Sequence, residues 1–215
     1  MSPSNNDIGV IDVGLGNVGS VLRMIEKAGG HGVRVTNPAD VAAFAKLILP
    51  GVGHFDHGMR LLNAAGFGPV LRDAGQRGEQ DLLGICLGMQ LLFEGSEEGE
   101  LEGLGLIGGH SVRFDASLSQ LRVPHMGWNE VDVCRENPLI ERTDAQGRRP
   151  RFYFVHSYHV VCSDPADVIG TVDYGSRITA AVQRGRVFGA QFHPEKSHRF
   201  GMDLIRRYVE LQPAC

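Results

Sequence analysis

The stretch that decides the fold is Leu82-Leu83-Gly84-Ile85-Cys86-Leu87-Gly88-Met89-Gln90. It predicts a buried strand, a tight turn with a cysteine at its tip, and a helix that begins at Leu87. Gly84 and Gly88 lie two residues to either side of Cys86, which is the spacing of the G-x-S-x-G nucleophile elbow with sulfur in place of oxygen. A side chain at either glycine would crowd the strand or the helix. The amides at the helix start favour a thiolate, so the stretch indicates a nucleophile, with a buried core cysteine as the alternative.

Composition and charge narrow the class of protein. The chain has 215 residues, 42% of them hydrophobic, and a formal net charge of −4. This length predicts a single domain over 1–215 with a polar tail at 1–7. The charge argues against a nucleic-acid partner, and no apolar run is long enough to cross a membrane. The tail lacks a signal peptide's apolar stretch, so we expect a cytoplasmic protein. The four cysteines form no C-x-x-C pair, so we expect no metal site and no disulfide framework. We also expect no cofactor.

The order of apolar runs predicts the fold class. Strands and helices alternate in the first half of the chain, whereas the second half is rich in strands. We therefore expect a three-layer α/β domain with a mainly parallel sheet and an antiparallel flap. The expected strands are 8–13, 33–36, 46–49, 112–114, 152–161, 168–174, 178–183 and 186–191. The expected helices are 18–28, 39–45, one or two within 59–77, 87–93 and 200–211, and the acidic run 95–100 is expected to be a solvated face.

A G-x-G-x-x-G match follows the first expected strand. Gly14, Gly16 and Gly19 have the offsets of a dinucleotide-binding turn, and a helix follows them. The acidic residue that such a site needs at the end of the second strand is missing, because Asn37 and Pro38 follow it there. A Gly-rich turn that serves packing or an interface is therefore favoured over a dinucleotide site.

A second Gly-rich loop, Gly51-Val52-Gly53, follows the expected strand 46–49. Glycines on both sides of Val52 let backbone amides point where side chains normally would, which is how an oxyanion site is built. An ordinary strand-to-helix turn is the alternative.

His193 and Glu195 lie two residues apart, just after the last expected strand. Extended residues at this spacing project to one side, so Glu195 can orient the ring of His193. With Cys86 they make a Cys-His-Glu triad for attack on a carbonyl, with the oxyanion met by the amide of Leu87 and one from the 51–53 loop. A structural histidine is the alternative for His193.

The same residues carry a family resemblance. The segments Gly84–Gln90 and Gln191–Ser197 resemble those of class I glutamine amidotransferases. Three further segments, Pro50–Gly53, Pro124–Asn129 and Phe154–Tyr158, make the chain similar to the HisH family, the glutaminase subunits of imidazole glycerol phosphate synthase. The resemblance runs from about residue 8 to residue 211.

The resemblance implies a flavodoxin-like fold and a complete set of functional residues. The implied triad is Cys86, His193 and Glu195, and the implied oxyanion donors are Leu87, Val52 and Gly53. The implied glutamine pocket is formed by Gly51, Gln90, Ser157 and Tyr158. The residues implied to face a partner are Asn17, Trp128, Tyr153 and Lys196. That partner is a HisF-type (β/α)8-barrel subunit, held in a heterodimer. It receives ammonia and makes imidazole glycerol phosphate and AICAR in histidine biosynthesis.

Several positions depart from the family pattern: Val13 and Gly19 in the first turn, the end segment Lys196–Met202 and the flap segment Ser157–Val160. They resemble a HisH-like paralogue that supplies ammonia for amidation of a surface sugar, so that pathway stays open beside histidine biosynthesis. A stand-alone γ-glutamyl thiol hydrolase and a non-catalytic subunit are two further hypotheses. A non-catalytic subunit predicts a broken triad, whereas Cys86, His193 and Glu195 are all present.

Overall fold

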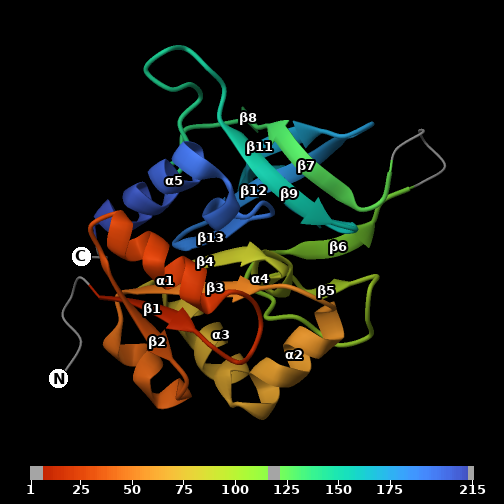
Figure 1. Ribbon diagram of the computed structural model, residues 1–215. Coiled ribbons are helices and arrows are strands. Elements are labelled where there is room, and N and C mark those ends of the chain that lie inside the picture. The colour runs from red at the N-terminus through yellow and green to blue at the C-terminus, as the bar shows by residue number, and fades with distance from the viewer. Residues whose placement is uncertain (1–6, 116–121, 213–215) are drawn as a thin grey trace.

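A computed structural model describes residues 7–115 and 122–212, and its centre is one mixed sheet of eight strands (Figure 1). The strand order is β2-β1-β3-β4-β13-β12-β11-β8. The parallel part is β1 (Asp7–Ile11), β2 (His31–Val35), β3 (Lys46–Gly51), β4 (Asp81–Cys86) and β13 (Val187–Ala190). The antiparallel part is β12 (Arg177–Arg184), β11 (Val168–Asp173) and β8 (Asp132–Val133). The predicted α/β class with a mainly parallel sheet is confirmed.

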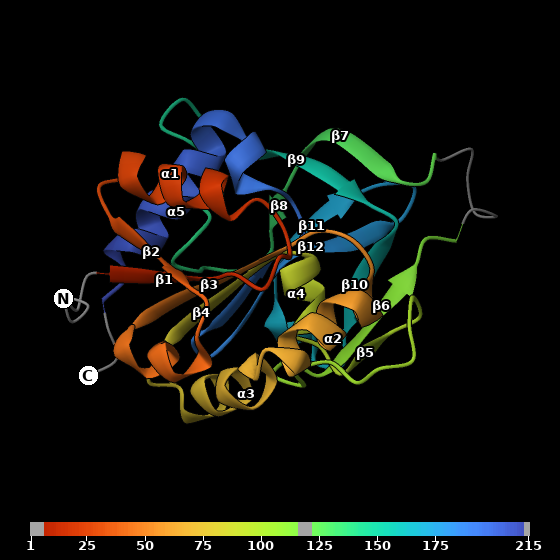
Figure 2. The same cartoon turned by 60° about the horizontal axis from the view of Figure 1, so that its bottom comes forward.

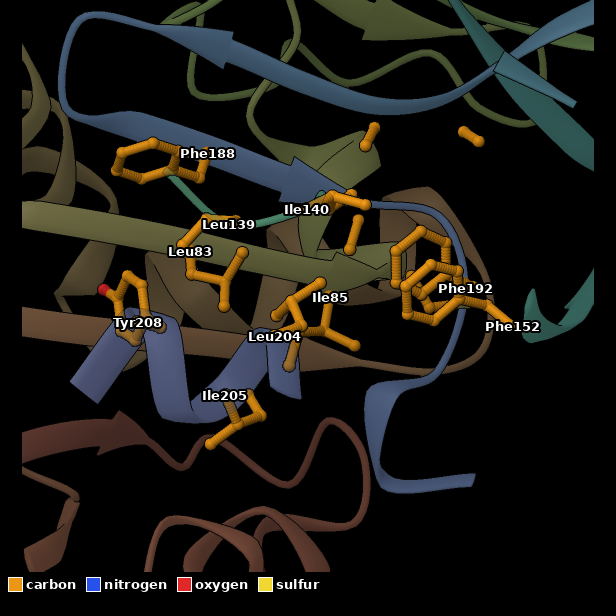
Figure 3. Close-up of a cluster of buried hydrophobic side chains, with 14 of the residues drawn as sticks. Leu83, Ile85, Leu139, Ile140, Phe152, Phe188, Phe192, Leu204, Ile205 and Tyr208 are labelled. Carbon is orange, nitrogen blue, oxygen red and sulfur yellow. The ribbon is translucent and has the colours of Figure 1, made fainter. Parts of the chain in front are cut away.

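Helices cover both faces of this sheet. One face carries α1 (Val18–Lys27) and α5 (His198–Glu210), and the other carries α2 (Phe55–Ala64), α3 (Phe67–Arg77) and α4 (Leu87–Leu91) (Figure 2). Along β4, Leu83 and Ile85 belong to the core under α1 and α5, whereas Leu82 belongs to the opposite core. Figure 3 shows Leu83 and Ile85 beside Leu204 of α5. Burial on both faces explains why β4 is a continuous apolar run.

Two smaller sheets lie beyond the carboxyl ends of the central strands. One is β10 (Tyr158–Cys162), β6 (Gly109–Arg113) and β5 (Gly95–Ser96); the other is a ribbon of β7 (His125–Glu130) and β9 (Arg151–His156). The prediction of one strand over 152–161 is wrong, because the chain changes partner at Ser157, from β7 to β6. Phe154, His156 and Val160 are buried at alternating positions and Tyr158, at the remaining one of these positions, is half-buried, so the apolar pattern gives little sign of the change.

Local boundaries differ from the prediction where polar caps decide them. The helix expected at 39–45 is a short 3-10 turn, η1 (Pro38–Ala43), and further 3-10 turns are η2 (Pro165–Asp167) and η3 (Pro194–Lys196). Helix α2 begins earlier than predicted, because Nδ1 of His54 accepts a hydrogen bond from the Asp56 amide at 3.2 Å. The longest described helix has 13 residues, and none in the described ranges is long and apolar enough to span a membrane.

The acidic run 95–100 is only partly a solvated face, which corrects the prediction. Gly95 and Ser96 are buried in β5. Glu97 accepts a hydrogen bond from the Arg113 amide at 2.8 Å, and Glu98 accepts one from the Phe55 amide at 2.8 Å. These carboxylates therefore tie the run to β6 and to the start of α2.

Candidate active site

Three neighbouring parallel strands end at one edge of the sheet and deliver the predicted site residues. Gly51, at the end of β3, is paired in register with Cys86, at the end of β4. Ala190, at the end of β13, is paired with Ile85. The segments after β3, β4 and β13 therefore emerge together, as expected where ligands bind outside the carboxyl ends of strands.

The elbow holds Cys86 in a strained backbone conformation. Its φ is 54° and its ψ is −110°, and among the described non-glycine residues only His198 also has a positive φ. A Cβ at Gly84 would lie 2.6 Å from the Gly88 carbonyl oxygen, and one at Gly88 would collide with the Leu49 carbonyl. Both glycines are thus required by close contact between β4, α4 and β3, and strain of this kind is typical of functional residues.

The oxyanion-loop candidate packs directly against the elbow. A Cβ at Gly51 would lie 2.7 Å from the Gly88 amide nitrogen. Gly53 has a φ of 107° with open space around it, and the side chain of Val52 is 48% exposed. The loop is close to α4 at its start and open toward solvent at its tip.

The first Gly-rich turn packs against this loop. Gly14 and Gly16 both have positive φ, and a Cβ at Gly16 would lie 3.3 Å from the Gly51 amide nitrogen. Asp12 accepts a hydrogen bond from the Gly14 amide at 3.0 Å and also pairs with Arg34. This supports the packing interpretation of the turn over the dinucleotide one.

His193 and Glu195 are joined by a hydrogen bond of 2.7 Å between Nδ1 and Oε1. The predicted extended geometry is wrong, because Pro194–Lys196 forms the 3-10 turn η3. Ser197 holds this turn by donating its hydroxyl to the His193 carbonyl at 2.6 Å. The turn is also tied to β9, since the His193 amide donates to the Tyr153 carbonyl at 2.9 Å and the Tyr153 amide donates to Ser197 Oγ at 3.0 Å.

The charge environment favours a protonated His193. Burial acts to lower the pKa of His193, but its interactions with Cys86 and Glu195 outweigh burial and raise that pKa to about 9. Within the described residues, His193 Nε2 and Glu195 Oε2 are buried and have no hydrogen-bond partner. Nε2 thus makes no hydrogen bond of standard geometry to sulfur, although Cys86 is close enough to affect the ring's charge. The free nitrogen is available for proton transfer.

A cavity of about 320 Å³ brings most of the predicted residues together. Those that line it are Val52, Gly53, Cys86, Leu87, Gln90, Ser157, Tyr158, His193 and Lys196. Gly51 does not line this cavity and packs against Gly88, and Glu195 contributes through the ring of His193. A larger cavity of about 380 Å³ between α5 and residues 139–150 contains no cysteine or histidine in its lining.

Four lining residues were not predicted: Glu98, Pro124, Val155 and His156. Glu98 is the most informative, because it puts a half-buried carboxylate on the cavity wall. Nothing in the acidic run distinguishes it from its neighbours. Val155 and His156 lie just before the change of sheet at Ser157, which the sequence pattern does not reveal.

The side-chain nitrogen of Gln90 is bound to other groups of the protein. Its Nε2 donates to the Tyr158 carbonyl at 3.0 Å and to Gln191 Oε1 at 3.1 Å. Because an amide nitrogen has two hydrogens, only the oxygen of Gln90 is left for a ligand.

Three of the four predicted partner-facing residues lie together. The Trp128 ring, 37% exposed, meets Tyr153 edge-on at 6.0 Å between centroids, and Lys196 Nζ lies 5.9 Å from the Tyr153 ring centre. His198 stacks on Trp128 at 5.2 Å. Asn17 is exposed at the start of α1, where its side chain accepts a hydrogen bond from the Ser20 amide at 3.1 Å.

Comparison with known proteins places this site in a family. The model for "Glutamine amidotransferase class-I" matches residues 9–210. The chain is 47% identical to "Imidazole glycerol phosphate synthase subunit HisH 2" of Pseudomonas aeruginosa over 202 residues, 94% of this chain and 98% of that protein. It is 44% identical to the protein of the same name from Methanococcus maripaludis over 203 residues, also 94% and 98%.

A solved structure shows the same fold at lower sequence identity. "Structure of PurLQS from Thermotoga maritima" aligns with a TM-score of 0.69 and 23% identity, covering 97% of this chain and 96% of that one. The family model and the sequence relatives together establish that this chain belongs to the class I glutamine amidotransferases and, within them, to the HisH family.

Proposed function

We propose that this chain is a glutaminase, acting as one domain over residues 1–215 in the cytoplasm, that hydrolyses glutamine to glutamate and ammonia. The observation that supports the proposal is that a strained cysteine and a histidine–glutamate pair lie at the same cavity. Cys86 stands on a strained elbow, and the buried His193–Glu195 pair opens onto the same space with a free Nε2. This combination is what nucleophilic attack on an amide needs.

The residues divide the reaction into two steps. The Cys86 thiolate attacks the side-chain carbonyl of glutamine, and the amides of Leu87 and of Val52 or Gly53 receive the oxyanion. Protonated His193 gives its Nε2 proton to the leaving nitrogen, which departs as ammonia. Neutral His193 then takes a proton from water, which attacks the thioester and releases glutamate. Glu195 holds the ring in one tautomer throughout.

The cavity wall also offers groups for the other end of glutamine. The half-buried Glu98 carboxylate has the charge to bind the α-ammonium group, and its place is fixed by the Phe55 amide. The free oxygen of Gln90 accepts from a second substrate N–H. Ser157 and Tyr158 also line the cavity.

The exposed face of the β7–β9 ribbon is the proposed contact with a HisF-type (β/α)8-barrel subunit. Trp128, Tyr153 and Lys196 lie there with Met126, whose side chain is 62% exposed. Exposed aromatic and methionine side chains of this kind are enriched at protein interfaces. In the heterodimer, ammonia passes to the barrel, which makes imidazole glycerol phosphate and AICAR in histidine biosynthesis.

A second candidate differs only in the partner. His198, one of the departures from the family pattern, stacks on Trp128 and therefore changes the proposed contact surface itself. This favours testing a partner that amidates a surface sugar alongside the histidine-pathway one.

The test is glutamate release by this chain with each barrel partner and its nucleotide-type ligand, in wild type and in Cys86→Ala. We expect the cognate partner to raise the wild-type rate and Cys86→Ala to show no rise. Equal rates in the two proteins would refute the mechanism. A fast rate that no partner changes would instead indicate a stand-alone γ-glutamyl hydrolase.

A further inference from the structure

A chain of buried polar groups leads from the β7–β9 ribbon to the nucleophile. In β7, His125 Nδ1 lies 3.1 Å from Nε2 of His156, and His156 Nδ1 lies 2.8 Å from the Tyr158 carbonyl oxygen. The same carbonyl accepts from Gln90 at 3.0 Å. These groups come from β7, β9, β10 and α4, so the chain joins the ribbon, the second sheet and the elbow helix.

The chain ends on sulfur. Gln90 Nε2 lies 3.1 Å from Gln191 Oε1, and Gln191 Nε2 lies 3.9 Å from Cys86 Sγ. Gln191 is fully buried, with 0% exposure, and follows β13 directly. It is therefore a side chain of the active-site edge that has no solvent contact and that points its amide at the reacting atom.

The Tyr158 carbonyl determines which atom donates in every hydrogen bond of this series of polar groups. The Tyr158 oxygen can only accept, so His156 Nδ1 and Gln90 Nε2 must both donate to it. A neutral His156 then accepts at Nε2, and His125 must donate there from Nδ1. On the other branch, Gln90 presents N–H to Gln191, so the near atom of Gln191 is oxygen and its N–H₂ faces Cys86. The amide orientation of Gln191 follows from the network and is not a free choice.

The surroundings keep the histidines of the chain uncharged. The His125 ring is stacked between Tyr174 at 3.9 Å and Phe154 at 4.7 Å. Burial lowers the pKa of His125 to about 4 and that of His156 to about 3. Neutral rings are what the donor assignment requires, since a protonated His156 could not accept from His125.

We infer that Gln191 is a positioning residue that donates a hydrogen bond to the Cys86 sulfur, and that Gln90, the Tyr158 carbonyl and the His156–His125 pair hold it in that orientation. An N–H donor favours the thiolate over the thiol. Through this chain of groups, the ribbon that carries Trp128 is linked to the nucleophile by hydrogen bonds. The inference rests on the proposed function only in taking Cys86 as the nucleophile.

The first test replaces Gln191 by Met, which keeps the size of the side chain and removes the donor. The rate of Cys86 alkylation by iodoacetamide is measured against pH on the full chain, following the Cys86 peptide by mass spectrometry. A hydrogen bond to a charged group corresponds to about one pH unit, so the acid limb of the profile should move up by about that much. Gln183→Met, a glutamine of β12 that donates to the Gly185 carbonyl, is the matched control and should leave the profile unchanged.

An unshifted profile in Gln191→Met overturns the inference. If that variant does not fold, as judged by its thermal midpoint, Gln191→Leu makes the same test. With the barrel partner present, kcat for glutamine should fall about tenfold with KM unchanged, because the lost contact is to sulfur and not to substrate. Alkylation needs neither glutamine nor partner. A shifted profile in a chain without glutaminase activity would therefore support the role of Gln191 while refuting the proposed function.

A matched pair at His125 tests the far end of the chain. His125→Asn keeps a donor near the position of Nδ1 and loses the stacked ring, whereas His125→Phe keeps the ring and loses the donor. We expect His125→Phe to shift the alkylation profile in the direction of Gln191→Met, and His125→Asn to resemble wild type. The reverse order would show that His125 contributes packing alone and would refute its place in the chain.

Discussion

Strand β4 starts at Asp81 and ends at Cys86. The buried polar groups near its two ends differ in how far other protein groups satisfy their hydrogen bonds. At the amino end, Asp81 Oδ2 pairs with Arg186 Nη2 at 2.7 Å, and the buried Lys46 donates to the Val209 carbonyl at 2.6 Å. At the carboxyl end, Nε2 of His193 and Oε2 of Glu195 are buried and have no hydrogen-bond partner among the described residues. Even so, Arg186 Nε at the amino end also lacks a partner within the described ranges.

The groups at the amino end of β4 therefore contribute to stability, whereas those at its carboxyl end contribute to the reaction. At the amino end, the charged groups of Asp81, Arg186 and Lys46 are bound mainly to one another and to backbone carbonyls near the end of α5, so little capacity is left for a ligand. At the carboxyl end, His193 lines the cavity that contains Cys86, and its unpartnered Nε2 is available to a substrate. The comparison therefore predicts that substitutions at the two ends affect different measurements.

The largest expected effect is on catalysis, from Glu195→Gln. The amide cannot hold the productive tautomer of His193, so kcat for glutamine hydrolysis with the partner should fall by about 10²–10⁴ while the thermal midpoint stays close to wild type. Glu102→Gln, an exposed acid, is the control and should keep full activity. If the thermal midpoint of Glu195→Gln fell together with kcat, the proposed difference between the two ends of β4 would be wrong.

Next in size is the elbow itself, tested by Gly84→Ala. Its Cβ would lie 2.6 Å from the Gly88 carbonyl, so backbone must move, and we expect a loss of about 3 kcal/mol in the free energy of unfolding together with loss of activity. Gly19→Ala in α1 is the matched control. Its Cβ would meet nothing closer than 3.6 Å, so helix propensity should make it neutral or stabilising by about 0.5 kcal/mol. Urea denaturation measures the free energy of unfolding of both variants, and equal values would contradict the prediction for Gly84.

At the amino end, Asp81→Asn should reduce stability and spare catalysis. It leaves Lys46 and Arg186 without their anion, and we expect the free energy of unfolding to fall by about 2 kcal/mol with kcat unchanged. Asp73→Asn, which removes an exposed i,i+4 pair with Arg77, should cost under about 0.5 kcal/mol. Equal losses in the two variants would show that burial of the Asp81 pair has no special effect.

The smallest expected effects, at most about 1.4 kcal/mol per pH unit, are two pH slopes of opposite sign. His193 has a raised pKa of about 9, so its charged state contributes stability that is complete below 6.5 and is lost as the pH rises through 9. His125 has a lowered pKa of about 4, so its contribution is complete above 6.5 and is lost as the pH falls toward 4. Urea denaturation from about pH 4 to about pH 9.5 should show the alkaline slope missing in His193→Gln and the acid slope reduced in His125→Phe, where His156 still contributes. A wild-type curve without the alkaline slope would contradict the assignment for His193, and one without the acid slope would contradict that for His125.

Local signals in the sequence were enough for the elbow and the parallel sheet. The glycine spacing around Cys86 and the continuous apolar run of β4 both arise from contacts within a few residues or from burial on two faces. The features that sequence reasoning missed depend on distant partners. Glu98 is placed by the Phe55 amide 43 residues away, and the break at Ser157 depends on which strand each half pairs with.

The geometry of the His193–Glu195 pair was also beyond sequence reasoning. The spacing of two residues predicted that the side chains meet, and they do, but through the turn η3 and not through extended backbone. The turn is held by Ser197 and Tyr153, which no local pattern links to it. Gln191 went unnoticed for the same reason, since its orientation depends on Gln90 and the Tyr158 carbonyl.

The tie between β9 and the η3 turn has a consequence for hydrogen exchange. A ribbon of two strands is marginally stable by itself, so β7 and β9 depend on packing and on their bonds to the turn. The His193 amide donates to Tyr153 and the Tyr153 amide donates to Ser197, so each amide is protected from exchange by a bond that joins β9 to the turn. The β7–β9 ribbon and the histidine turn should therefore open as one cooperative unit, with a shared opening free energy.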